Sequence, residues 1–120
     1  MKNFLKSGMA FLLFLLANNY NAQIQNARTE TAKVYGNCGM CKTTIEKAIN
    51  EKDVVEAVWN KDTKILSLTY DPKKTNRKAI LKKVAEAGYD NEAYQAPKTA
   101  YDKLHSCCQY ERPNLNVKKQ

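Results

Sequence analysis

The order of the hydrophobic patterns between Thr31 and Tyr94 constrains the fold of this 120-residue chain more than any other feature. Residues 31–35 alternate between polar and apolar, which is typical of a strand with one buried face. Apolar residues then recur at helical spacing, at Cys41, Ile45, Ala48 and Ile49. Residues 54–59 and 65–70 are rich in β-branched, aromatic and alternating apolar residues, and 60–63 are turn-forming, so this region predicts a hairpin.

A second helix and a last short strand complete the pattern. Thr75 is the expected N-cap, and Gly88 is the expected stop after the helix. The apolar face between them consists of Ile80, Leu81, Val84, Ala85 and Ala87. Residues 89–94 are the expected last strand. The order βαββαβ predicts an α+β, ferredoxin-like sandwich, in which two helices cover one face of a four-stranded antiparallel sheet.

Residues 1–22 have the features of a secretory signal peptide. Lys2 and Lys6 precede an uninterrupted apolar run at 9–17, and that run is much shorter than the roughly 20 apolar residues that span a bilayer. A buried N-terminal helix is the alternative. With cleavage near Ala22 we expect a periplasmic or secreted protein without stable membrane insertion, whose thiols leave the reducing cytosol.

The formal net charge is +8, with 20 Lys and Arg against 12 Asp and Glu. A basic chain can bind nucleic acid, but here no basic stripe is interleaved with aromatic residues, so we expect no nucleic-acid partner. The sequence also has no glycine-rich phosphate loop, no Ser/His/Asp arrangement and no convincing pair of carboxylates. We therefore expect that the protein is not an enzyme.

Cys38 and Cys41 form a CxxC motif where the first strand turns into the first helix. Two intervening residues let both sulfurs approach one point, and the N–H groups at a helix N-terminus stabilise thiolates. Thiolates are soft ligands. Because a structural zinc site takes four ligands, two sulfurs alone favour an ion of low coordination number such as Cu(I) or Hg(II).

Other functions of a CxxC motif remain open. Haem attachment requires a histidine after the second cysteine, where this chain has Lys42. A periplasmic thiol–disulfide oxidoreductase would use the same motif at a strand–helix junction. However, no Trp precedes Cys38, and the order of elements differs from that of the thioredoxin fold. A plain structural disulfide is the third alternative.

The sequence around the motif resembles the heavy-metal-associated domain, which occurs in copper chaperones, in the N-terminal modules of metal-pumping ATPases and in periplasmic mercury-binding proteins. The likeness runs from about Thr31 to Tyr94. It rests on Val34-Tyr35-Gly36-Asn37-Cys38-Gly39-Met40-Cys41-Lys42, on Asp71-Pro72 and on Ala87-Gly88-Tyr89. It assigns residues 30–96 to such a domain and implies Cys38 and Cys41 as metal thiolates, with Tyr89 in a loop near the metal.

The resemblance also implies a cargo and a partner. The cargo is a soft metal ion, foremost Cu(I), with Hg(II), Zn(II) and Cd(II) as alternatives. The partner is a metal-transporting ATPase or another metal-acceptor protein, and the protein itself is expected to be a monomer. One position departs from the family, which usually has a Met two residues before its first Cys, packed under the metal loop. This chain has Gly36 there, and Met40 is the candidate substitute.

Residues 97–120 lie outside the resemblance and form a polar tail with a short ordered patch expected around 101–108. Within it, Cys107 and Cys108, with His105 nearby, are candidate ligands. Adjacent cysteines seldom pair with each other because a vicinal disulfide is strained. They could complete the first site, which would become three- or four-coordinate and suit zinc as well as copper. A separate second site and disulfides within the chain are the alternatives.

Overall fold

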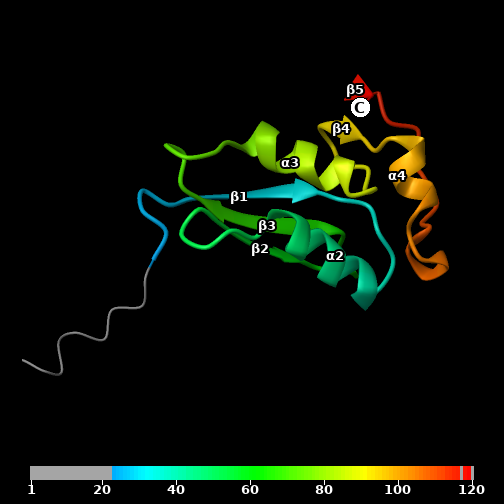
Figure 1. The fold of residues 1–120 in the computed structure, drawn as a ribbon, viewed down its shortest axis with the longest axis horizontal. Coiled ribbons are helices and arrows are strands. Elements are labelled where there is room, and N and C mark those ends of the chain that lie inside the picture. Colours follow the sequence, from blue (N-terminus) through cyan, green and yellow to red (C-terminus); the bar gives the residue numbers. More distant parts are fainter. Residues whose placement is uncertain (1–22, 117, 120) are drawn as a thin grey trace, which may run out of the picture.

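The computed structural model describes residues 23–116 and 118–119, and the expected signal peptide at 1–22 lies outside these residues. The fold is α+β (Figure 1). The elements in chain order are β1 (Arg28–Lys33), α2 (Gly39–Ile49), β2 (Val55–Trp59), β3 (Ile65–Tyr70), α3 (Arg77–Glu86), β4 (Tyr94–Gln95), α4 (Lys98–Asp102), the 3₁₀ turn η2 (Ser106–Cys108) and β5 (Lys118–Lys119).

The main sheet has three antiparallel strands, with β3 between β1 and β2. Alternate residues of β2 are buried and exposed, as are most of those in β3. One face of the sheet therefore packs into the core and the other contacts solvent. Trp59 ends β2 opposite Leu66 of β3, and both side chains are buried. This pairing places the large indole ring at the end of the sheet where the CxxC motif lies.

The two long helices bury most of the apolar stripes that the sequence predicted, whereas Ala48 and Ala87 are half-buried. The buried residues of α2 are Cys41, Ile45 and Ile49, and those of α3 are Ile80, Leu81, Val84 and Ala85. The two helices contact each other, and α2 also contacts β2. The expected N-cap Thr75 is wrong by one residue, since the Asn76 side chain accepts a hydrogen bond from the Ala79 N–H at 2.9 Å. Gly88 follows the helix with φ of 109°, as the stop signal predicted.

The structure differs from the prediction at the fourth strand. In the described part of the chain, the segment 89–94 contributes one antiparallel bridge, Val34 with Asn91, and β4 pairs instead with β5 in parallel. The physical reason is a turn at Asn91, whose side-chain oxygen accepts hydrogen bonds from the N–H groups of Ala93 and Tyr94, both at 3.0 Å. This Asx-type turn redirects the backbone after a single bridge.

The C-terminal segment packs against the domain more extensively than the prediction of a polar tail suggested. α4 and η2 lie at the end of the molecule where β1 leads into α2 (Figure 1). Cys108 and Tyr110 belong to the same buried cluster as Trp59 and Leu66. Among the residues that the structure describes, none of the helices has the length and hydrophobicity needed to cross a membrane.

Candidate metal centre

The loop from β1 into α2 rests on Trp59. The indole is 1% exposed, and its Nε1 donates a hydrogen bond to the Val34 carbonyl at 3.0 Å. A Cβ at Gly36 would lie only 2.9 Å from the indole Cη2 and 3.3 Å from the Cys41 Cβ. Glycine is therefore the residue that lets the loop approach the ring. Met40 does not substitute for the family's buried methionine, because its side chain is 47% exposed.

The two cysteines of the motif also cap the helix. Cys38 is the N-cap residue of α2, and its sulfur accepts from the Cys41 N–H in a capping box. The Cys41 sulfur accepts from the backbone N–H groups of Asn37 and Cys38, both at 3.4 Å. A capping box is ordinarily built from hydroxyl and carboxyl side chains. Here two thiols take those roles, so the N–H groups that the helix leaves unpaired stabilise negative charge on sulfur.

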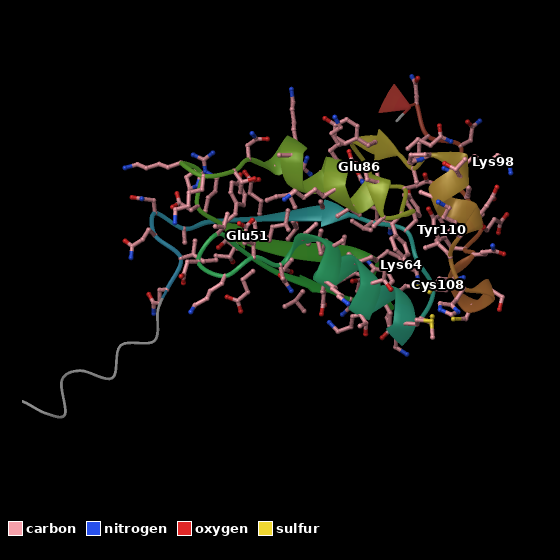
Figure 2. The ribbon with its side chains drawn as sticks, viewed as in Figure 1. Glu51, Lys64, Glu86, Lys98, Cys108 and Tyr110 are labelled. Carbon is pink, nitrogen blue, oxygen red and sulfur yellow. The ribbon has the colours of Figure 1, made fainter. Side chains whose placement is uncertain are left out.

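The C-terminal segment places its two cysteines on this motif. The Cys41 and Cys108 sulfurs are 2.6 Å apart, and all four thiols are free. The Cys38 sulfur is 3.5 Å from that of Cys41, 3.5 Å from that of Cys107 and 3.7 Å from that of Cys108. The sulfurs of Cys38, Cys41 and Cys108 all lie within 4.8 Å of one another. Figure 2 labels Cys108 at the end of the molecule where α2 begins.

The thiols of the cluster differ in acidity. The hydrogen bond from the Cys41 N–H, supported by contacts with the Cys107, Cys41 and Cys108 thiols, lowers the pKa of Cys38 to about 6. Burial raises the pKa of Cys108, and its hydrogen bond with Cys41 adds to this effect. The hydrogen bond with Cys38 raises the pKa of Cys107. At neutral pH the cluster therefore holds Cys38 as a thiolate beside neutral tail thiols.

Of the five predicted site residues, the structure brings the four cysteines together and leaves His105 apart. Cys41 and Cys108 are buried, whereas Cys107 and His105 are exposed. The backbone carbonyl of His105 accepts a hydrogen bond from the Cys108 N–H at 2.8 Å. The His105 imidazole belongs to no potential metal cluster among the described residues. The assignment of these residues as metal ligands stays a prediction.

Tyr89 lies next to the thiol cluster, beside Cys108. Its side chain is fully buried, and its hydroxyl makes no hydrogen bond within the described part of the chain. Burial raises the pKa of Tyr89, and the neighbouring Cys108 thiol adds to the shift. The phenol is therefore a neutral polar group beside the thiols.

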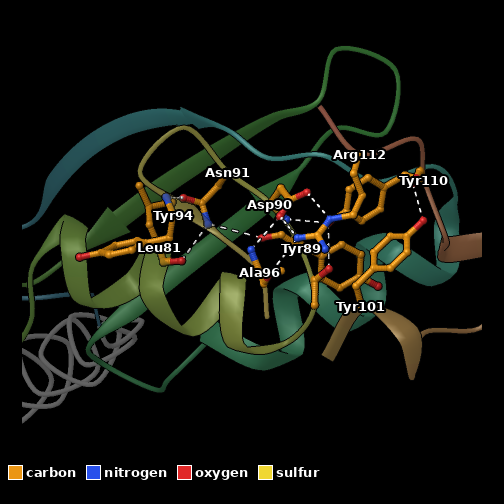
Figure 3. Close-up of polar contacts among 10 residues, drawn as sticks. Leu81, Tyr89, Asp90, Asn91, Tyr94, Ala96, Tyr101, Tyr110 and Arg112 are labelled. Atoms are coloured by element: carbon orange, nitrogen blue, oxygen red, sulfur yellow. Dashed lines mark hydrogen bonds and ion pairs between the residues drawn. The ribbon is translucent and has the colours of Figure 1, made fainter. Parts of the chain in front are cut away.

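A network that the sequence did not indicate anchors the C-terminal segment (Figure 3). The Tyr110 hydroxyl donates to the Gly88 carbonyl at 2.9 Å and accepts from the Asp90 N–H at 2.7 Å. Arg112 binds both carboxylate oxygens of Asp90, at 2.9 and 2.7 Å, and also donates to the Ala96 carbonyl at 2.6 Å. Asp90 is fully buried and the Arg112 side chain is 22% exposed, so the carboxylate of this bidentate ion pair is removed from water.

Aromatic contacts complete the anchor. The ring of Tyr110 stacks on Tyr89 with centroids 6.0 Å apart, and Tyr101 meets Tyr110 edge-on at 5.1 Å. The Tyr101 hydroxyl donates to the Tyr110 carbonyl at 2.6 Å. These residues occur singly in a polar stretch without periodicity. The only signal in the sequence is that Tyr110 and Arg112 lie two residues apart, as side chains on one face of an extended segment do.

Comparison with known proteins identifies the framework around the motif. The family model of the heavy-metal-associated domain matches residues 37–90. The structure of the CopZ metallochaperone is 32% identical in sequence, with a TM-score of 0.50, and the match covers 53% of this chain and 98% of CopZ. The chain belongs to the heavy-metal-associated domain family. Oxidized MerP from Ralstonia metallidurans is 31% identical, also with a TM-score of 0.50, over 54% of this chain and 93% of MerP.

Two relatives are copper-exporting P-type ATPases. The protein from Staphylococcus epidermidis is 29% identical over 81 residues, which are 67% of this chain and 10% of the ATPase. The protein from Staphylococcus saprophyticus is 32% identical over 68 residues, which are 56% of this chain and 9% of the ATPase. The chain thus spans about a tenth of the length of these relatives. The tail cysteines lie outside the matched family model, so the family accounts for only half of the thiol cluster.

Proposed function

We propose that this protein binds Cu(I) through the thiolates of Cys38 and Cys41 and carries it to an acceptor protein. The observation that carries this proposal is the pair of sulfurs 3.5 Å apart at the N-terminus of α2, held by three backbone N–H groups. Soft thiolates suit Cu(I). The similarity to CopZ and to copper-exporting ATPases supports copper among the candidate cargoes, ahead of Hg(II), Zn(II) and Cd(II).

The accessibility of Cys38 supports transfer rather than permanent storage. Its side chain is partly exposed, so a cysteine of another protein can approach a metal bound there. The acceptor we propose is a metal-transporting ATPase or another protein with a soft-metal site, met by a monomer of this chain. We further propose that the protein acts in the periplasm or outside the cell, after removal of residues 1–22.

Titration of the reduced protein with Cu(I), in competition with a chelator of known affinity, tests the proposal. We expect one tightly bound equivalent. The double variant Cys38→Ser/Cys41→Ser should lose that binding, because it removes both thiolates of the motif. A His105→Ala variant is the matched control and should bind as the wild type does, since its imidazole lies outside the thiol cluster. Unchanged binding in the double variant would contradict the proposal.

The thiol–disulfide oxidoreductase is the second candidate. The observation that favours it is the hydrogen bond from the Cys41 N–H to the Cys38 sulfur, which lowers the pKa of Cys38 to about 6. A thiolate at neutral pH is the nucleophile that disulfide exchange requires. Turnover of a disulfide substrate by the metal-free protein, lost in Cys38→Ser, would support this function. The metal-carrier proposal predicts no such turnover.

A further inference from the structure

We propose that the C-terminal segment 97–112 is a built-in cap that adds Cys108 as a third thiolate ligand, so that the metal is bound by three sulfurs and released slowly. This inference rests on the proposed function, because Cys38 and Cys41 supply the other two sulfurs. It changes the character of the site from an open two-thiolate loop to a covered centre. The cap lies outside residues 37–90, which the heavy-metal-associated family model matches.

The geometry selects Cys108 rather than Cys107. The Cys108 sulfur lies 2.6 Å from that of Cys41 and 3.7 Å from that of Cys38, and its side chain is 1% exposed. A cation of low coordination number placed among these three sulfurs would be within reach of all of them. Cys107 is exposed, and its sulfur lies 3.5 Å from Cys38 and 3.8 Å from the Met40 Sδ. It therefore sits at the rim of the cluster.

The cap is held by contacts that do not involve sulfur. Arg112 pairs with the buried carboxylate of Asp90, and the Tyr110 hydroxyl bridges the Gly88 carbonyl and the Asp90 N–H. Gly88 shows how closely the segment approaches, because a Cβ there would lie 3.0 Å from the Ala100 carbonyl oxygen. The backbone of Cys107 is also fixed, since its carbonyl accepts from the Asn37 side chain at 3.4 Å.

This anchoring makes Cys108 a preorganised ligand. A third ligand on a flexible tail would have to be ordered when the metal binds, and that ordering would cost conformational entropy. Here Tyr110, two residues after Cys108, is already fixed in the core. The burial of Cys108 also keeps water and competing thiols away from one side of the ion. Both effects slow the release of the metal, so an acceptor must compete with three protein sulfurs.

The experiment compares the neighbouring variants Cys108→Ser and Cys107→Ser in the reduced, full-length protein loaded with one equivalent of Cu(I). The release rate to a large excess of a chromogenic Cu(I) chelator is measured by stopped flow. We expect Cys108→Ser to release copper at least about tenfold faster, in line with losses of 10–100-fold when a metal site loses a supporting group. Cys107→Ser should change the release rate much less than Cys108→Ser does, because its sulfur contacts Cys38 but lies outside the cluster of three sulfurs.

The coordination number gives a readout that altered stability alone would not produce. Copper K-edge X-ray absorption should show three sulfur neighbours in the wild type and in Cys107→Ser, and two in Cys108→Ser. Tyr110→Phe tests the anchor, since it removes both hydroxyl contacts while keeping the ring. Tyr110 is a positioning residue, and its loss should accelerate release while Cys108 is still present.

The outcomes separate this inference from the proposed function. If the double variant Cys38→Ser/Cys41→Ser abolishes binding while Cys108→Ser has the release rate and coordination number of the wild type, the cap is not a ligand and the two-thiolate carrier stands. If copper binding is unchanged in that double variant, the proposed function itself fails. A second tightly bound equivalent that disappears in Cys107→Ser and Cys108→Ser would show a separate tail site and would also overturn the inference.

Discussion

At the scale of single residues, Cys38 combines a lowered pKa with access to solvent. The hydrogen bond from the Cys41 N–H and contacts with three thiols stabilise its thiolate, which lowers the pKa to about 6. Because folding lowers this pKa, the resulting stabilisation is present above the ordinary thiol pKa and is lost as the pH falls through 6. The thiolate is also the form that binds a soft metal. Metal uptake should therefore persist under mildly acidic conditions.

This acidity predicts how fast Cys38 is alkylated. In the reduced, metal-free protein the rate with iodoacetamide should rise through pH 6 and level off above neutrality, since only the thiolate reacts. Peptide mapping by mass spectrometry assigns the modified residue. Cys107 is a control within the same molecule, because it is exposed but has a raised pKa. Its alkylation should increase only in the alkaline range. A Cys38 profile that matched that of Cys107 would contradict the prediction.

At the scale of elements, the junction between β1 and α2 depends on one close contact. Gly36 leaves room for the buried Trp59 ring, whose hydrogen bond to Val34 keeps it in place. Gly39, three residues later in the same junction, has no neighbouring atom within 4 Å of where a Cβ would lie. The two glycines therefore have different roles, although both lie within four residues in the sequence.

The variants Gly36→Ala and Gly39→Ala form a matched pair. We expect Gly36→Ala to lower the free energy of unfolding by about 1–3 kcal/mol, because the added methyl overpacks the contact with Trp59. Gly39→Ala should leave stability unchanged or raise it by about 0.4–1 kcal/mol, since alanine restricts the unfolded chain without a clash. Urea denaturation followed by Trp59 fluorescence measures both. Equal effects of the two substitutions would show that the ring yields and that Gly36 is not required.

The elements also show what the sequence could predict. The periodic segments, α2, β2, β3 and α3, were predicted within a few residues, because each buries a regular stripe of apolar side chains. The fourth strand was not, since the side chain of Asn91 redirects the backbone and local turn chemistry overrides the alternation of 89–94. The family resemblance found Cys38 and Cys41, but neither periodicity nor resemblance indicated how Cys108 would meet them.

At the scale of the whole molecule, contacts far apart in the sequence build the site. Residues 88–90 follow α3, and residues 110–112 follow η2, yet their contacts determine where the tail cysteines lie. Single polar and aromatic residues of this kind give no periodic signal. The sequence therefore indicated that the tail cysteines could complete the first site, but not how the tail docks. The described chain is thus a heavy-metal-associated domain extended by a segment that shares its core.

The ion pair between Asp90 and Arg112 should decide whether that segment stays docked. In Arg112→Gln the fully buried Asp90 carboxylate loses its cation, and removing one partner of a buried pair typically costs about 3–5 kcal/mol. The cost should appear as local opening of the tail. The Asp90 N–H, which donates to the Tyr110 hydroxyl, should then exchange with deuterium at least roughly a hundredfold faster.

Lys98→Gln is the matched control for this prediction. It removes an ion pair with Asp102 on the same segment, but the Lys98 side chain is 81% exposed, so stability should change by less than about 1 kcal/mol. Adding Asp90→Asn to Arg112→Gln should restore part of the protection, because the double variant no longer buries an unpaired charge. If the Asp90 N–H exchanged no faster in Arg112→Gln than in Lys98→Gln, the ion pair would not be the anchor of the tail, and the stacked tyrosines alone would hold it.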